Sequence, residues 1–227
     1  EEDLELIPVL KGMGLRVMQL TYNERNYVGD GCFERVDAGL TRFGIEVIKR
    51  MNEHGLVIDL SHAGPQTTVE AIEKSETPVA ITHSNPEALY DYPRNKTDEQ
   101  IKLLAQKGGV FGCTFWPFFL KKGMKATLSD YVDTIDYVVD LVGINFVSIA
   151  SDFFANRGKK ELQKFRAGRA KPWWTIEIEW PVVMPEGVRE PEDYPNITAE
   201  LVKRGYSERD ITKILGGNLT RLFEQVW

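Results

Sequence analysis

Short apolar runs alternate along the chain with segments in which apolar residues recur every three or four positions. The short runs are typical of buried strands, and the periodic segments are typical of amphipathic helices. The pattern therefore predicts strands over 15–20, 56–60, 78–82, 109–115 and 145–150.

Capping residues mark several of the intervening helices. Thr41 precedes a helix that ends at Gly55, and Pro65 suits the first turn of the next helix. Thr97 has capping-box spacing for a helix that ends at Gly108. Further helices are predicted over 3–13, 128–141, 197–204, 207–215 and 218–226. Strands that alternate with helices in this way pair in parallel, with functional residues at their carboxyl ends.

Two architectures agree with this alternation. One is a doubly wound sheet, and the other is a (β/α)8 barrel, also called a TIM barrel. The glycine-rich phosphate loops that often mark nucleotide-binding sheets are absent from the sequence. A barrel takes about 250 residues and eight strands. We therefore expect one partial barrel domain over 1–227 with about five of the eight βα units. Its first strand, at 15–20, would lie at an open edge of the sheet, so we expect an upstream segment or a partner to cover it.

Composition narrows the classes of partner. The chain is 42% hydrophobic and 27% charged, with a net charge of -6 and no basic stripe, so nucleic acid is not an expected partner. Cys32 and Cys113 are too few for a disulfide framework. No apolar run approaches the roughly 20 residues of a membrane span, and the start does not resemble a signal peptide. The cellular location stays open, with a weak preference for the cytoplasm.

Two of the three histidines, His62 and His83, each close an apolar run in successive βα units. Strand ends converge at the mouth of a parallel barrel, so this pattern predicts a metal site of the kind found in metal-dependent hydrolases. A hydrogen-bonded core role is the alternative for either histidine alone. His54 lies in the last turn of a helix, where it complements the helix dipole, and is not expected to bind metal. Asp59 either supports the metal site or is a buried, hydrogen-bonded carboxylate.

Two charged residues follow strand ends and could bind a substrate. Arg94 lies in the loop beyond the His83 strand, where its guanidinium could bind a substrate carboxylate or form an ion pair within the protein. Asp152 ends the fifth strand, where it could bind a substrate ammonium, take a proton from a metal-bound water, or cap the loop.

The segment from about 153 to 193 interrupts the alternation. It holds basic runs over 157–160 and 164–171, followed by Trp173, Trp174 and Trp180. A long loop after a barrel strand is often a lid or a substrate wall, and these indoles could stack on a ligand. The alternative is that the tryptophans pack the loop onto the barrel or onto a second subunit.

From about Asp3 to Phe223 the chain resembles the membrane dipeptidase (renal dipeptidase) family of zinc metallopeptidases and its bacterial members. The resemblance is carried by several short motifs that are specific only in combination. They are Leu20–Asn23, Gly39–Gly44, Met51–Asn52, Asp59–His62, Thr82–Asn85, Pro93–Asn95, Gly108–Val110, Ser151–Phe153 and Ile214–Asn218.

The resemblance implies a zinc (β/α)8 barrel that cleaves dipeptides. By this resemblance His62 and His83 match the two histidines that bind the second zinc ion of a two-zinc site. Arg94 matches the arginine that holds the substrate carboxylate, and Asp152 matches the aspartate near the substrate amine. Tyr22 stands where the family has a histidine that contacts the tetrahedral intermediate, and its phenol can donate a hydrogen bond but carries no positive charge at neutral pH.

Two further departures limit what the resemblance implies. The family's His-x-Asp metal motif and its bridging glutamate have no match in the chain, so the ligands of the first zinc ion are not encoded here. The family pattern Ser-Asp-Phe-Asp-Gly reads Ser151-Asp-Phe-Phe154, followed by the tryptophan-rich insertion.

The sequence therefore predicts a metal-dependent dipeptidase that hydrolyses the peptide bond through a metal-bridged hydroxide. Arg94 and Asp152 would bind the two termini of a small peptide, and Tyr22 would contact the reacting carbonyl. A homodimer is possible. The alternatives are a related amidohydrolase that acts on another N-acyl or amide substrate, and a non-catalytic, metal-poor binding barrel.

Overall fold

A computed structural model describes residues 2–153 and 182–227 of the chain. The predicted basic runs over 157–160 and 164–171, and the tryptophans at 173, 174 and 180, lie outside the described residues. Within the two described ranges, no helix combines the length and the apolar character that a membrane span requires.

All five predicted strands are present, and they form one parallel sheet. The strands are β1 (Val17–Gln19), β2 (Val57–Asp59), β3 (Ala80–Ser84), β4 (Val110–Thr114) and β5 (Val147–Ala150). Most are shorter than the apolar runs that predicted them, because only part of each run pairs with a neighbour. Their order in the sheet is their order in the chain. Among these five described strands there is therefore no reversal of strand order of the kind that defines a doubly wound fold.

The helices confirm the capping predictions. The Thr41 hydroxyl accepts a hydrogen bond from the Gly44 amide, and Thr97 forms a complete capping box with Gln100. The helices are α1 (Leu6–Gly12), α2 (Arg42–Glu53), α3 (Pro65–Lys74), α4 (Asp98–Gln106), α5 (Leu128–Val142), α7 (Tyr194–Lys203), α8 (Glu208–Thr212) and α9 (Asn218–Val226). The 3-10 turns are η1 (Pro117–Phe119), η2 (Gly123–Lys125), η3 (Ile144–Phe146) and η4 (Pro191–Asp193), and η5 (Lys213–Gly217) is a π turn.

Helix α7 begins three residues before its predicted start at Ile197. The reason is Pro195, the second residue of this helix, which suits a first helical turn because no intrahelical partner is lost there. The predicted helix over 207–215 also differs from the structure, since its second half forms the π turn η5.

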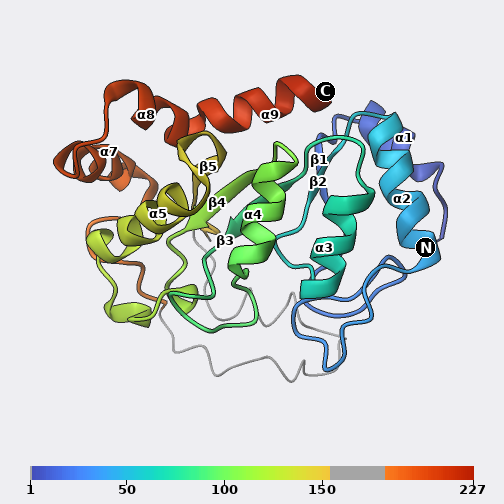
Figure 1. The fold of residues 1–227 in the computed structure, drawn as a ribbon, viewed down its shortest axis with the longest axis horizontal. Helices are drawn as coiled ribbons and strands as arrows, with labels where there is room; N and C mark the ends of the chain where they lie inside the picture. The colour runs from blue at the N-terminus through green and yellow to red at the C-terminus, as the bar shows by residue number, and fades with distance from the viewer. Residues whose placement is uncertain (1, 154–181) are drawn as a thin grey trace.

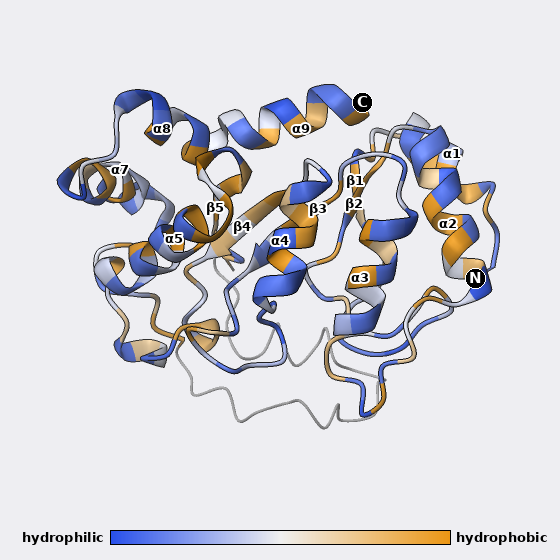
Figure 2. Ribbon diagram, in the orientation of Figure 1, coloured by the Kyte–Doolittle hydropathy of each residue, from blue (hydrophilic) through white to orange (hydrophobic). Residues whose placement is uncertain are grey.

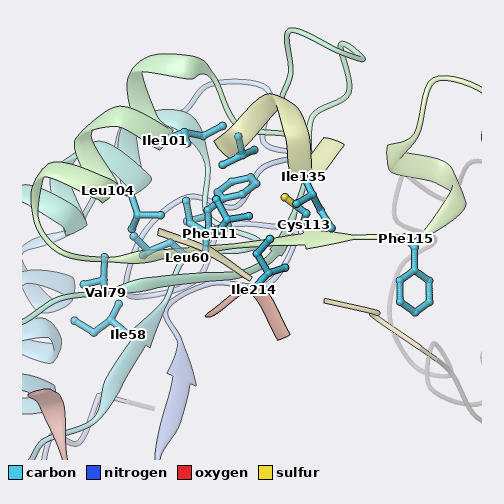
Figure 3. Packing of buried hydrophobic residues seen from close by; sticks show 14 of the residues in the cluster. Ile58, Leu60, Val79, Ile101, Leu104, Phe111, Cys113, Phe115, Ile135 and Ile214 are labelled. Carbon is cyan, nitrogen blue, oxygen red and sulfur yellow. The ribbon is translucent and has the colours of Figure 1, made fainter. Parts of the chain in front are cut away.

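Helices α2, α3, α4 and α5 stand side by side along one face of the sheet (Figure 1). Each of these helices carries both hydrophilic and hydrophobic residues (Figure 2), and the apolar residues that they bury belong to the same core cluster as residues of the strands. Ile101 and Leu104 of α4 lie over Phe111 of β4 in this core (Figure 3), and all three side chains are almost completely buried. The helical layer therefore excludes water from this face of the sheet.

The last helix, α9, covers the amino ends of the strands. Its residues Leu222 and Val226 pack against Val57, Ala80 and Val110, which are the first residues of β2, β3 and β4. Apolar packing closes this end of the sheet. The polar groups of the sheet therefore lie at the opposite end, where the strands have their carboxyl ends.

Candidate metal and substrate site

The two strand-end histidines lie together, as the sequence predicts. His83 is in β3, and His62 follows the end of β2 by three residues. Their Nε2 atoms are 3.1 Å apart, and the two ring centres are 5.1 Å apart. In contrast, His54 is the C-cap residue of α2, which places it near the amino end of β2 and away from this pair.

A buried amide holds the ring of His62. The His62 Nδ1 atom is 2.7 Å from Oδ1 of Asn23, a residue that the coil after β1 contributes. Because an amide oxygen can only accept a hydrogen bond, Nδ1 carries the ring proton. The lone pair of His62 is therefore on Nε2, the atom that faces His83.

A chain of polar groups holds the ring of His83 in the same tautomer. Both oxygens of the buried Asp59 carboxylate accept hydroxyl protons, from Ser61 at 2.5 Å and from Thr82 at 2.8 Å. The Thr82 hydroxyl has then used its proton, so it accepts from Nδ1 of His83 at 2.8 Å. Asp59 thus orients His83 through Thr82, the arrangement typical of residues behind a metal ligand.

The paired Nε2 lone pairs fit a metal cation. Burial is the main cause that lowers the pKa of both histidines, and the nearby Arg94 lowers both further, so a proton is a poor occupant of the space between them. Two nitrogens bound to one zinc ion at a tetrahedral angle would be about 3.3 Å apart, close to the 3.1 Å found here. Among the described residues, no group of three or more histidine, cysteine or carboxylate side chains could hold a metal ion.

Arg94 presents an incompletely bonded guanidinium close to the histidines. Its Nη2 donates to the backbone oxygen of His83 at 3.2 Å, and its guanidinium carbon is 4.8 Å from the ring centre of Phe119. The side chain is almost fully buried, yet its Nε has no hydrogen-bond partner. No carboxylate in the described ranges forms an ion pair with it, so the alternative of an internal ion pair is not observed.

Asp152 lies just beyond the end of β5 and has an unusual backbone. Its φ angle is +52°, and it is the one residue other than glycine with positive φ in the part of the chain that the structure describes. Strained backbones of this kind cluster at functional sites. The Asp152 carboxylate is near enough to His83 to raise the pKa of that ring, against the larger effect of burial.

Tyr22 lies against the histidine pair. Its ring stacks on the ring of His62 with centres 4.3 Å apart and an interplanar angle of 26°. Nearly half of the side chain is exposed. The structure thus brings Tyr22, His62, His83, Arg94 and Asp152 to the carboxyl ends of β1, β2, β3 and β5, where the sequence predicts them.

The supporting residues Asn23, Ser61 and Thr82 were not predicted. Each had a signal in the sequence, because each lies beside a predicted site residue in one of the motifs that carry the family resemblance. The bonds themselves depend on how separate segments meet, so the roles follow only from the fold.

Comparison with known proteins gives the family of the chain. The sequence model described as "Membrane dipeptidase (Peptidase family M19)" matches residues 1–167 and 181–227. Dipeptidase verJ of Clonostachys rogersoniana is 29% identical over 219 residues, which cover 94% of this chain and 49% of that protein. Dipeptidase 3 of Mus musculus is 30% identical over 189 residues, which cover 83% of this chain and 33% of that protein.

A solved structure is similar over the whole chain. The crystal structure of an amidohydrolase from Pseudomonas aeruginosa has a TM-score of 0.94 and 38% identity, covering 100% of this chain and 69% of its own. This chain spans about half or less of the length of the two curated relatives. The family model nevertheless matches nearly all of the chain, and the chain belongs to the membrane dipeptidase family, peptidase family M19.

Proposed function

We propose that this protein is a metal-dependent hydrolase that cleaves dipeptides. The observation that carries the proposal is the pair of Nε2 lone pairs 3.1 Å apart, beside a buried arginine with an unpartnered N–H. Membership of the membrane dipeptidase family and the names of its curated relatives support the same activity.

In this proposal His62 and His83 hold one zinc ion, and Asn23 and Thr82 keep both rings in the tautomer that binds it. The complete family site is expected to hold two zinc ions, and the His-x-Asp motif that the resemblance implies for the first ion has no match in the sequence. When bound, zinc acts as a Lewis acid toward the substrate carbonyl and lowers the pKa of a water molecule.

Three residues would bind and orient the dipeptide. Arg94 would bind the terminal carboxylate through its guanidinium, whose Nε–H the protein leaves unpaired. Asp152 would bind the terminal ammonium, and the Tyr22 phenol would donate a hydrogen bond to the reacting carbonyl oxygen. A longer peptide does not present both terminal charges at this spacing, so recognition of both selects dipeptides.

The same reasoning extends to the fold. We propose that the sheet is part of a (β/α)8 barrel and that residues 1–227 form one partial barrel domain, with an inserted loop at about 153–193. The chain-order sheet and the row of helices on one face support this proposal, because a barrel repeats both features around its axis.

A second candidate is an amidohydrolase for other N-acyl or amide substrates. The similarity to the Pseudomonas aeruginosa amidohydrolase favours this candidate. The two candidates differ in the substrate ammonium, which a dipeptide has and an N-acyl amino acid lacks. A substrate panel that contains matched pairs of the two kinds separates them.

The test is zinc content by elemental analysis together with hydrolysis of this panel. We expect bound zinc that is lost in the His62→Ala and His83→Ala variants and retained in His54→Ala, the matched control. Arg94→Lys should raise KM for dipeptides but not for dipeptide amides, which lack the terminal carboxylate. A protein that takes up no zinc after reconstitution, or that retains it in both histidine variants, would contradict the proposal.

A further inference from the structure

Lys96 places an ammonium in the protein interior. Only 2% of the residue is exposed, and its Nζ donates to the backbone oxygen of Ala63 at 2.6 Å and to Oγ1 of Thr68 at 3.2 Å. No described carboxylate forms an ion pair with it. Burying a cation without a counter-ion is costly, and a methionine of similar length would fill the space at lower cost.

One end of the Lys96 contact lies beside a proposed metal ligand. Ala63 directly follows His62, and the His62 carbonyl accepts a hydrogen bond from the amide of Cys32 at 2.9 Å. The Ala63 carbonyl also accepts from the Thr68 hydroxyl at 3.3 Å. The Lys96 ammonium therefore completes the bonding of two successive carbonyls, which fixes the path of the backbone that carries the imidazole.

Lys96 itself belongs to the segment 94–96, which is hydrogen-bonded to the end of β3. The Ser84 hydroxyl donates to the Arg94 carbonyl at 2.7 Å, and the Lys96 amide donates to the Asn85 carbonyl at 2.9 Å. Arg94 itself donates to the carbonyl of His83. Lys96 thus connects the backbone next to His62 with the segment that is bonded next to His83.

We propose that Lys96 is a positioning residue that sets the separation of the two metal-binding imidazoles. Its ammonium binds the Ala63 carbonyl, which directly follows His62. Arg94, two residues before Lys96, donates to the His83 carbonyl. Lys96 would thereby fix the position of the metal relative to Arg94, which would bind the substrate carboxylate. This inference rests on the proposed function, because the separation matters only if both rings bind one metal ion.

The test compares Lys96→Met with Lys122→Met, a matched control whose ammonium pairs with Asp130 on the surface. Metal-free protein is titrated with Co²⁺, and the visible absorption bands report both affinity and coordination geometry. We expect Lys96→Met to weaken Co²⁺ binding about tenfold, the lower end of the range for groups that orient metal ligands, and to change the band shape. Lys122→Met should leave both unchanged.

A folded Lys96→Met protein with wild-type affinity and wild-type bands would overturn the inference, whatever its stability. If this variant does not fold, Thr68→Val decides by the same titration, because it removes the hydroxyl that contacts both Nζ and the Ala63 carbonyl. A weaker affinity then supports the inference, and an unchanged affinity overturns it. A wild-type protein that binds no Co²⁺ overturns the proposed function instead.

Discussion

Replacing Asp59 by asparagine should change the tautomer of His83 with almost no change in shape. The carboxylate accepts protons at both oxygens, including the Thr82 hydroxyl proton at 2.8 Å. In the variant an NH₂ group replaces one acceptor. If it faces Thr82 it must donate, and the Thr82 hydroxyl then turns its proton toward Nδ1 of His83. The ring proton of His83 would move to Nε2, the atom that faces His62.

The magnitude follows from the bonds that are lost. A hydrogen bond to a charged group contributes about 1.5–3 kcal/mol, so Asp59→Asn should lower the free energy of unfolding by about that amount. Metal affinity should fall by about 10–100-fold, because the lone pair of His83 no longer points at the metal position. The loss of metal affinity is separate from the loss of stability, because it is measured on protein that is folded.

Three measurements check this prediction. Long-range ¹⁵N–¹H spectra of the metal-free protein report which ring nitrogen of His83 is protonated, Co²⁺ titration reports affinity, and urea unfolding reports stability. Asp136→Asn is a suitable control, because the Asp136 carboxylate accepts from the Tyr206 hydroxyl at 2.7 Å and from the Arg204 guanidinium, neither of which is a residue of the candidate site. An Asp59→Asn protein that keeps the Nδ1-protonated tautomer and wild-type Co²⁺ affinity would refute the reasoning.

Three further predictions follow from particular residues. Asp152→Gly should raise the free energy of unfolding by about 1 kcal/mol, because glycine accepts positive φ without strain, while dipeptide hydrolysis falls; equal loss of stability and activity in urea and kinetic assays would contradict this. Gly31→Ala should destabilise the protein by about 1–3 kcal/mol and weaken Co²⁺ binding, because the added methyl group overlaps the backbone of Asn23, the residue that orients His62; wild-type values for both quantities would contradict this. Burial, followed by repulsion from Arg94, lowers the pKa of Lys96 from 10.5 to about 8. Between these pH values the unfolded chain keeps a proton that the folded protein loses, so the unfolding free energy should rise with pH relative to Lys96→Met, by about 3 kcal/mol over the full range; parallel pH profiles of the two proteins in urea unfolding would contradict this.

The sequence predicted those features that depend on neighbouring residues. Strands and caps such as Thr41 and Thr97 were predicted because hydrophobic period and capping are local properties. The start of α7 was missed, since Pro195 suits a first helical turn as well as a loop. Lys96 gave no signal as a buried residue, because a lysine after a loop is ordinarily solvated.

Sequence alone therefore determined the kinds of element, their order, and the placement of His62 and His83 at successive strand ends. The tertiary structure decided what those histidines can do. Asn23 bonds to His62 across 39 residues of chain, and Lys96 reaches Ala63 across 33. Tautomer and ring separation depend on such distant contacts, which form only when β1, β2 and β3 pair and the loops beyond them pack together.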